Sequence, residues 1–278
     1  MSSKRNILLI IYQYNYRMSF VKALFFTTLI VIYILFTKII STINVSFFNG
    51  NLFLKDFFEN SYYYIGLLLV INLNGGGNEI PSLFEIKTRE KMGQVFCFSL
   101  ILFVCVYILI PSLLNFSLFI YKDEELILQH YEASTFHLIG LLVVGPVFEE
   151  LFFRQIMVQQ FQMRYGDIRA VFLSSFLFSI MHFPRYGDLP MLFVFGILAA
   201  YIYLKTKNVF ITIGIHSLIN LYTVLHLKNP MPILRWLNHY YEIPGFWFYY
   251  TIGFLFLLCT CYYSIRFINE YHEKYISQ

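Results

Sequence analysis

The sequence predicts an all-α fold, a polytopic transmembrane helical bundle of about eight spans with both termini in the cytoplasm. Of its 278 residues, 58% are hydrophobic and only 13% are charged, whereas soluble domains have nearer one quarter charged residues. Long apolar runs recur along the chain, and most are about long enough to cross a bilayer as a helix. Basic residues also gather on alternate loops, as they do in membrane proteins of fixed orientation.

The spans are placed by apolar runs between polar segments. They lie near residues 21–40, 60–74, 93–120, 136–161, 168–183, 189–204, 208–227 and 245–266. The first is long and lacks a small-residue cleavage site, so we expect a retained helix and not a cleaved signal peptide. One set of alternate loops holds 13 Lys and Arg residues and the other holds 6, which predicts that both termini are cytoplasmic.

The net charge of +4 does not indicate a nucleic-acid partner, because the basic residues are scattered at the ends of spans. The expected surroundings are the lipid bilayer. The four cysteines fall inside apolar runs, where cysteine is usually a small buried hydrophobe, so neither disulfides nor cysteine metal ligands are predicted. The abundance of Phe (32) and Tyr (23) resembles the proteins of AT-rich bacteria, which indicates a bacterial cytoplasmic membrane.

The segment VVGPVFEELFFRQ, residues 143–155, places three charges inside a predicted span. A charge at the bilayer centre costs about 2.5–3.5 kcal/mol on insertion scales, so these residues are candidates for function. Glu150 and Arg154 are four residues apart and can form an ion pair on a helix, whereas Glu149 points about 100° away. Helix packing would explain the ion pair but not Glu149, which is a candidate general base. Pro146, just before, leaves one carbonyl without its helical donor.

His182, in FSIMH, is expected to lie opposite Glu149. The segment RYGD, centred near Gly166, predicts the turn between two consecutive spans. Glu149 lies 17 residues before Gly166 and His182 lies 16 residues after it. At about 1.5 Å of rise per residue, both lie roughly 25 Å from the turn, so they can face each other in an antiparallel hairpin.

His216 and Asn220, in HSLIN, share one helix face because they are four residues apart. Two aligned donors in a dry site can stabilise a developing oxyanion. The alternative is a hydrogen-bonded contact between helices, worth about 0.6 kcal/mol in membranes. The side chains of Glu149, His182 and His216 also have the ligand types of a zinc site, which is the alternative to metal-free chemistry.

Three motifs together resemble the CPBP family of CAAX-processing and bacteriocin-processing membrane proteases, also called Abi proteins. EELFFR (149–154) matches Glu-Glu-x-x-x-Arg, FSIMH (178–182) matches Phe-x-x-x-His, and HSLIN (216–220) matches His-x-x-x-Asn. Their order and their placement on separate predicted spans also fit the family. The resemblance covers roughly residues 136–227 and departs at Gln155, where many relatives have glycine.

The resemblance implies a glutamate endopeptidase that needs no metal or other cofactor. Glu149 would activate water, His182 would hold that water, and the ion pair of Glu150 and Arg154 would support the site. His216 and Asn220 would form the oxyanion hole. The chain would then divide into an N-terminal transmembrane region (1–135), a catalytic core (136–227) and a C-terminal span with a tail (228–278).

The leading hypothesis is therefore an intramembrane endopeptidase whose substrate is a membrane-associated peptide or protein. In a bacterium its role would be peptide maturation, quorum-sensing peptide processing or self-immunity against bacteriocins. The alternative is a non-catalytic immunity or scaffold protein of the same family, although every motif residue is present. A transporter with a proton relay would be expected to show repeated halves, and the sequence shows no internal repeat.

Overall fold

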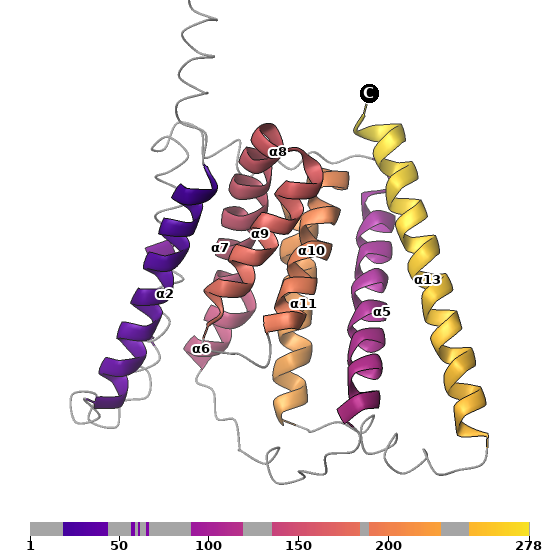
Figure 1. Cartoon of the computed structure of the whole chain (residues 1–278), viewed down its shortest axis with the longest axis horizontal. Coiled ribbons are helices and arrows are strands. Elements are labelled where there is room, and N and C mark those ends of the chain that lie inside the picture. Colours follow the sequence, from indigo (N-terminus) through magenta and orange to yellow (C-terminus); the bar gives the residue numbers. More distant parts are fainter. Residues whose placement is uncertain are drawn as a thin grey trace, which may run out of the picture. The chain divides into compact units, whose positions relative to one another are not determined.

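The computed structural model describes residues 19–43, 57–58, 61, 65–66, 90–118, 135–183, 189–228 and 245–277. All regular secondary structure in these ranges is helical, which confirms the predicted all-α class for them. The chain, whose helices are drawn in Figure 1, divides into two compact units. The first unit comprises Met1–Glu85 and Val144–Leu204, and the second comprises Ile86–Val143 and Lys205–Gln278.

The helices fall close to the predicted spans. In chain order they are α2 (Phe20–Ile43), α5 (Met92–Leu118), α6 (Thr135–Ile139), η2 (Gly140–Val144), α7 (Gly145–Glu150), η3 (Leu151–Val158), α8 (Gln159–Tyr165), α9 (Asp167–Met181), α10 (Leu189–Thr206), α11 (Val209–Lys228) and α13 (Phe246–Tyr275). The predicted span 60–74 lies mostly outside the described residues. The division of the chain at residues 135 and 227 stays a prediction.

The first unit is organised around the hairpin of α8 and α9. Gly166 joins the two helices with φ +82°, a conformation that glycine adopts without strain, and the predicted turn is confirmed. Helix α9 packs against η3, α8 and α2. Helix α10 approaches α9 closely, because a Cβ added at Gly196 would lie 2.8 Å from the Cβ of Ser175. Small residues permit such close helix contacts in membranes.

The second unit contains α5, α11 and α13. Helix α13 packs along α5, and α11 also contacts α5. The rings of Phe98 and Phe267 stack with centroids 4.2 Å apart, joining α5 to α13. At the end of α13, the carbonyl of Lys205 accepts a hydrogen bond of 3.0 Å from Nδ1 of His272. The contacts with α5 hold α11 and α13 in the unit, and the hydrogen bond ties the end of α13 to Lys205.

The backbone from Thr135 to Tyr165 is helical throughout but not uniformly α-helical. Two stretches, η2 and η3, are π-helical, with hydrogen bonds that join each carbonyl to the amide five residues later. Pro146 lies in the first turn of α7, and because the chain is already helical before it, its missing amide leaves a carbonyl of the preceding turn without a backbone donor. Glu149 and Glu150 end α7, directly before η3, so the predicted catalytic segment lies between two π-helical stretches, which are frequent at functional sites.

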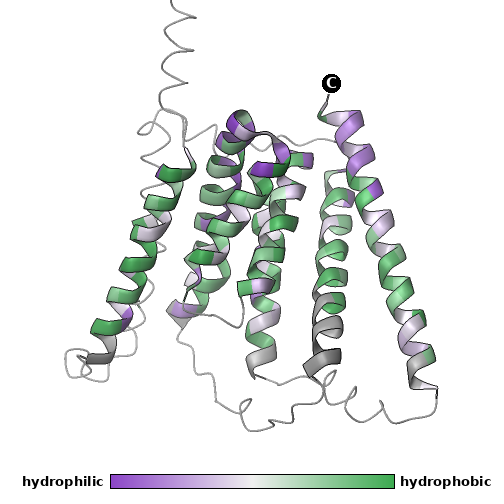
Figure 2. Ribbon diagram, in the orientation of Figure 1, coloured by the Kyte–Doolittle hydropathy of each residue, from purple (hydrophilic) through white to green (hydrophobic). Residues whose placement is uncertain are grey.

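Three described helices are long and apolar enough to cross a membrane, at Phe20–Ile40, Leu189–Thr206 and Phe248–Tyr275. Figure 2 shows apolar residues along most of α2 and more polar residues towards the C-terminal end of α13. A stripe of large apolar side chains on α2 is exposed, comprising Val21, Phe25, Leu29, Ile32, Phe36 and Ile39. Such a face suits lipid better than water. The eight spans and the cytoplasmic termini stay predictions.

Candidate active site

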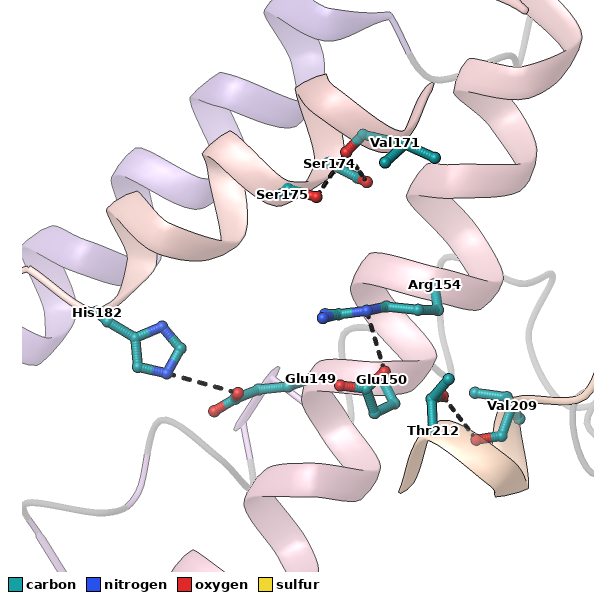
Figure 3. Close-up of polar contacts among 9 residues, drawn as sticks. All are labelled: Glu149, Glu150, Arg154, Val171, Ser174, Ser175, His182, Val209 and Thr212. Atoms are coloured by element: carbon teal, nitrogen blue, oxygen red, sulfur yellow. Dashed lines mark hydrogen bonds and ion pairs between the residues drawn. The ribbon is translucent and has the colours of Figure 1, made fainter. Parts of the chain in front are cut away.

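Glu149 and His182 meet within the first unit. Glu149 lies at the end of α7 and is 3% exposed, whereas His182 is the residue that ends α9. The Oε2 atom of Glu149 lies 3.6 Å from Nε2 of His182, and Figure 3 shows the two side chains pointing toward each other. The predicted contact between them, which rested on equal distances from Gly166, is confirmed.

The other ring nitrogen of His182 fixes the ring's orientation. Nδ1 lies 2.9 Å from the backbone carbonyl of Phe178, one turn earlier on α9. A carbonyl oxygen only accepts hydrogen bonds, so Nδ1 carries the hydrogen. In the neutral ring Nε2 is therefore an acceptor, and it faces the carboxylate of Glu149. The 3.6 Å separation is longer than a direct hydrogen bond and fits a bridging donor.

Glu150 and Arg154 form the predicted ion pair. Their Oε2 and Nε atoms are 3.0 Å apart (Figure 3), and the two side chains are 0% and 1% exposed. The distance is that of an ion pair, although the contact is not aligned as a hydrogen bond. Two buried opposite charges largely offset each other's electrostatic penalty, and removing one of them is strongly destabilising.

Aromatic rings surround the guanidinium group of Arg154. Its central carbon lies 4.4 Å from the ring centroid of Phe178, 5.5 Å from that of Phe195 and 6.0 Å from that of Phe153. All three phenylalanines are buried. Desolvated cation–π contacts of this kind are worth about 2 kcal/mol or more. The rings thus give the buried cation favourable contacts in addition to its ion pair with Glu150.

Phe178 joins the two pairs. Its ring lies 4.7 Å from the imidazole of His182, centroid to centroid, as well as against Arg154. Its carbonyl also accepts the hydrogen bond from His182. Phe178 is the first residue of the motif FSIMH, but no role was predicted for it from the sequence. Its place one turn before the histidine was the signal that it packs against that ring.

His216 and Asn220 lie on α11, in the second unit. His216 is buried, with 5% of its surface exposed. Asn220 donates a hydrogen bond of 2.9 Å from Nδ2 to the backbone carbonyl of Leu141. Because the amide nitrogen carries two hydrogens, this bond leaves a second one as a donor. The structure thus brings together the Glu149–His182 and Glu150–Arg154 pairs, while the predicted convergence of all six residues stays a prediction.

Metal ligation was the alternative chemistry for Glu149, His182 and His216. Among the residues that the structure describes, no group of three or more His, Cys, Asp and Glu side chains is placed to share a metal ion. The chemistry that the described side chains can perform themselves is proton transfer at Glu149 and His182, and the donors on α11 can stabilise negative charge.

The chain is similar to one family of endopeptidases and to one curated protein named as a putative membrane peptidase. The family profile described as "Type II CAAX prenyl endopeptidase Rce1-like" matches residues 131–222, which include all six predicted site residues. The curated "Putative membrane peptidase YdiL" of Bacillus subtilis (strain 168) is 27% identical over 139 residues, which are 49% of this chain. The chain spans about half of that relative, 53% of its length. No solved structure matches the chain.

Proposed function

Because residues 131–222 match the Rce1-like family of type II CAAX prenyl endopeptidases and the chain is similar to a putative membrane peptidase, we propose that it is a membrane endopeptidase in which Glu149 activates water. The observation that carries the proposal is the pair of acceptors formed by Glu149 Oε2 and His182 Nε2, 3.6 Å apart. One water molecule can donate a hydrogen to each of them, which directs its lone pair at a substrate carbonyl.

The reaction proceeds without a covalent intermediate. The water oxygen attacks the carbonyl carbon while its proton passes to Glu149, and the carbonyl oxygen becomes an oxyanion. His216 and Asn220 donate hydrogen bonds to that oxyanion. Collapse of the tetrahedral intermediate breaks the C–N bond, and Glu149 returns the proton to the leaving amine. The buried pair of Glu150 and Arg154 holds the backbone next to Glu149.

The proposed substrate is a membrane-associated peptide or protein, and the proposed location is a bacterial cytoplasmic membrane crossed by about eight spans. The curated relative is a bacterial protein whose printed name describes a membrane peptidase, which supports both. Within a bacterium, the candidate roles are peptide maturation, quorum-sensing peptide processing and self-immunity against bacteriocins. Each role requires only that a peptide bond near the membrane is cut.

The test compares cells that express the wild-type chain, Glu149→Ala or a control variant, with peptide products read by mass spectrometry at equal protein level. Glu270→Gln is the matched control, because Glu270 is an exposed carboxylate paired with Arg266 on α13. We expect products that disappear in Glu149→Ala and persist in the control. Identical products in all three strains would favour the non-catalytic scaffold protein instead.

A further inference from the structure

Pro146 creates a defect in the helix that leads to Glu149. Proline has no amide hydrogen, so one carbonyl in the preceding turn lacks its backbone donor. The preceding stretch, η2, is π-helical from Gly140 to Val144, and in this geometry a carbonyl pairs with the amide five residues later. Counted in that register, the carbonyl that would pair with residue 146 is that of Leu141.

Asn220 supplies the missing donor. Its Nδ2 atom lies 2.9 Å from the carbonyl oxygen of Leu141. A carbonyl only accepts hydrogen bonds, so the amide nitrogen and not the amide oxygen must face it. Backbone carbonyls in an apolar setting need such a partner, because no water replaces it. Asn220, on α11, therefore donates a hydrogen bond to the carbonyl of Leu141, which in this register has no backbone amide to pair with because residue 146 is proline.

This contact also orients the amide of Asn220. With one Nδ2 hydrogen directed at Leu141, the amide plane is fixed and the second hydrogen has one direction only. The backbone is helical without a break from Leu141 to Glu149, so a change of hydrogen-bond register at Leu141 would rotate the residues that follow it. A side chain that holds this register therefore influences how Glu149 is presented.

We propose that Asn220 is a positioning residue, which replaces the backbone donor lost at Pro146 and so fixes the π-helical register before Glu149. The structural half of the proposal, the pairing with Leu141, is independent of any activity. The second half, the effect on Glu149, rests on the proposed function. The positioning role is compatible with the proposed role of Asn220 as an oxyanion donor, because the two roles use different hydrogens of the same nitrogen.

The pairing is tested by a double-mutant cycle on the melting temperature of the purified full-length chain in detergent. Asn220→Leu keeps the branching of the side chain at Cγ but removes the donor, and Pro146→Ala restores a backbone amide. We expect Asn220→Leu to lower the melting temperature by about 2–4 °C in the wild-type background, the shift that about 1 kcal/mol produces in a chain of this size. In the Pro146→Ala background the same change should lower it by less than about 1 °C.

Thr223→Val is the matched control, since Thr223 lies on the same helix and donates a hydrogen bond within that helix, to the carbonyl of Ile219 one turn earlier. Its effect should be equal in both backgrounds. An equal loss for Asn220→Leu in both backgrounds would overturn the pairing with the proline defect. This measurement needs no substrate, so it stands even if the chain cleaves nothing.

The effect on Glu149 is tested by kcat on a peptide that the wild-type chain cleaves. We expect Asn220→Leu to lower kcat with little change in KM, and Pro146→Ala to restore part of it, several-fold, in the double variant. A purely structural role would change the amount of folded protein and not kcat per folded molecule. A double variant that is no faster than Asn220→Leu alone would overturn the positioning role.

Discussion

Replacing Arg154 by methionine tests whether the buried ion pair stabilises the first unit. Arg154 and Glu150 are 1% and 0% exposed, so Arg154→Met leaves a buried carboxylate without this counter-charge. Removing one partner of a buried pair costs about 3–5 kcal/mol. The cation–π contacts with Phe178 and Phe195 are lost as well. At about 2–4 °C per kcal/mol, the melting temperature should fall by about 6–20 °C.

Two further variants separate charge from packing. Glu150→Gln combined with Arg154→Met removes both charges, and should recover most of the lost stability because no uncompensated charge remains. Arg154→Lys keeps the charge but loses the planar guanidinium that lies over the Phe178 ring, so its stability should be intermediate. The assay is thermal unfolding of the purified chain in detergent. If Arg154→Met alone is as stable as the double variant, the pair does not carry the electrostatic role assigned to it.

Two further predictions concern helix packing. Gly196→Ala should lower the melting temperature, because its Cβ would lie 2.9 Å from the backbone Cα of Ser175 and crowding of this kind costs about 1–3 kcal/mol. The control is Gly253→Ala, because a Cβ added at Gly253 has no heavy atom within 4 Å, and this change should leave the melting temperature equal or raise it. Equal effects at the two glycines would contradict the close approach of α10 to α9. Tyr203→Phe removes the hydroxyl that accepts a hydrogen bond from Gln159, so the free energy of unfolding should fall by about 1 kcal/mol; an unchanged melting temperature would contradict this.

Much of the first unit could be predicted because its determinants are local. Glycine readily adopts positive φ, which located the turn at Gly166. The regular rise of a helix then placed Glu149 level with His182, and four-residue spacing paired Glu150 with Arg154. These steps needed only short-range geometry, and the structure bears them out.

The surroundings of the site could not be predicted in the same way. Phe195 reaches Arg154 from α10, and the rotation of one helix against another is set by packing along both helices. The π-helical stretches η2 and η3 were also missed. Pro146 was recognised as a source of an unsatisfied carbonyl, but identifying Asn220 as its donor required the tertiary contact with Leu141.

The central claim is that Glu149 and His182 act together on one water molecule. It is tested most directly by the rate at which the purified chain hydrolyses a peptide found in the product analysis, for wild type, Glu149→Gln, His182→Gln and the double variant. Each single variant should be slower by about 10²–10⁴-fold, the usual contribution of general acid–base catalysis. The double variant should be little slower than the slower single one, because the two groups act as a unit. Hydrolysis by Glu149→Gln at the wild-type rate would contradict the account.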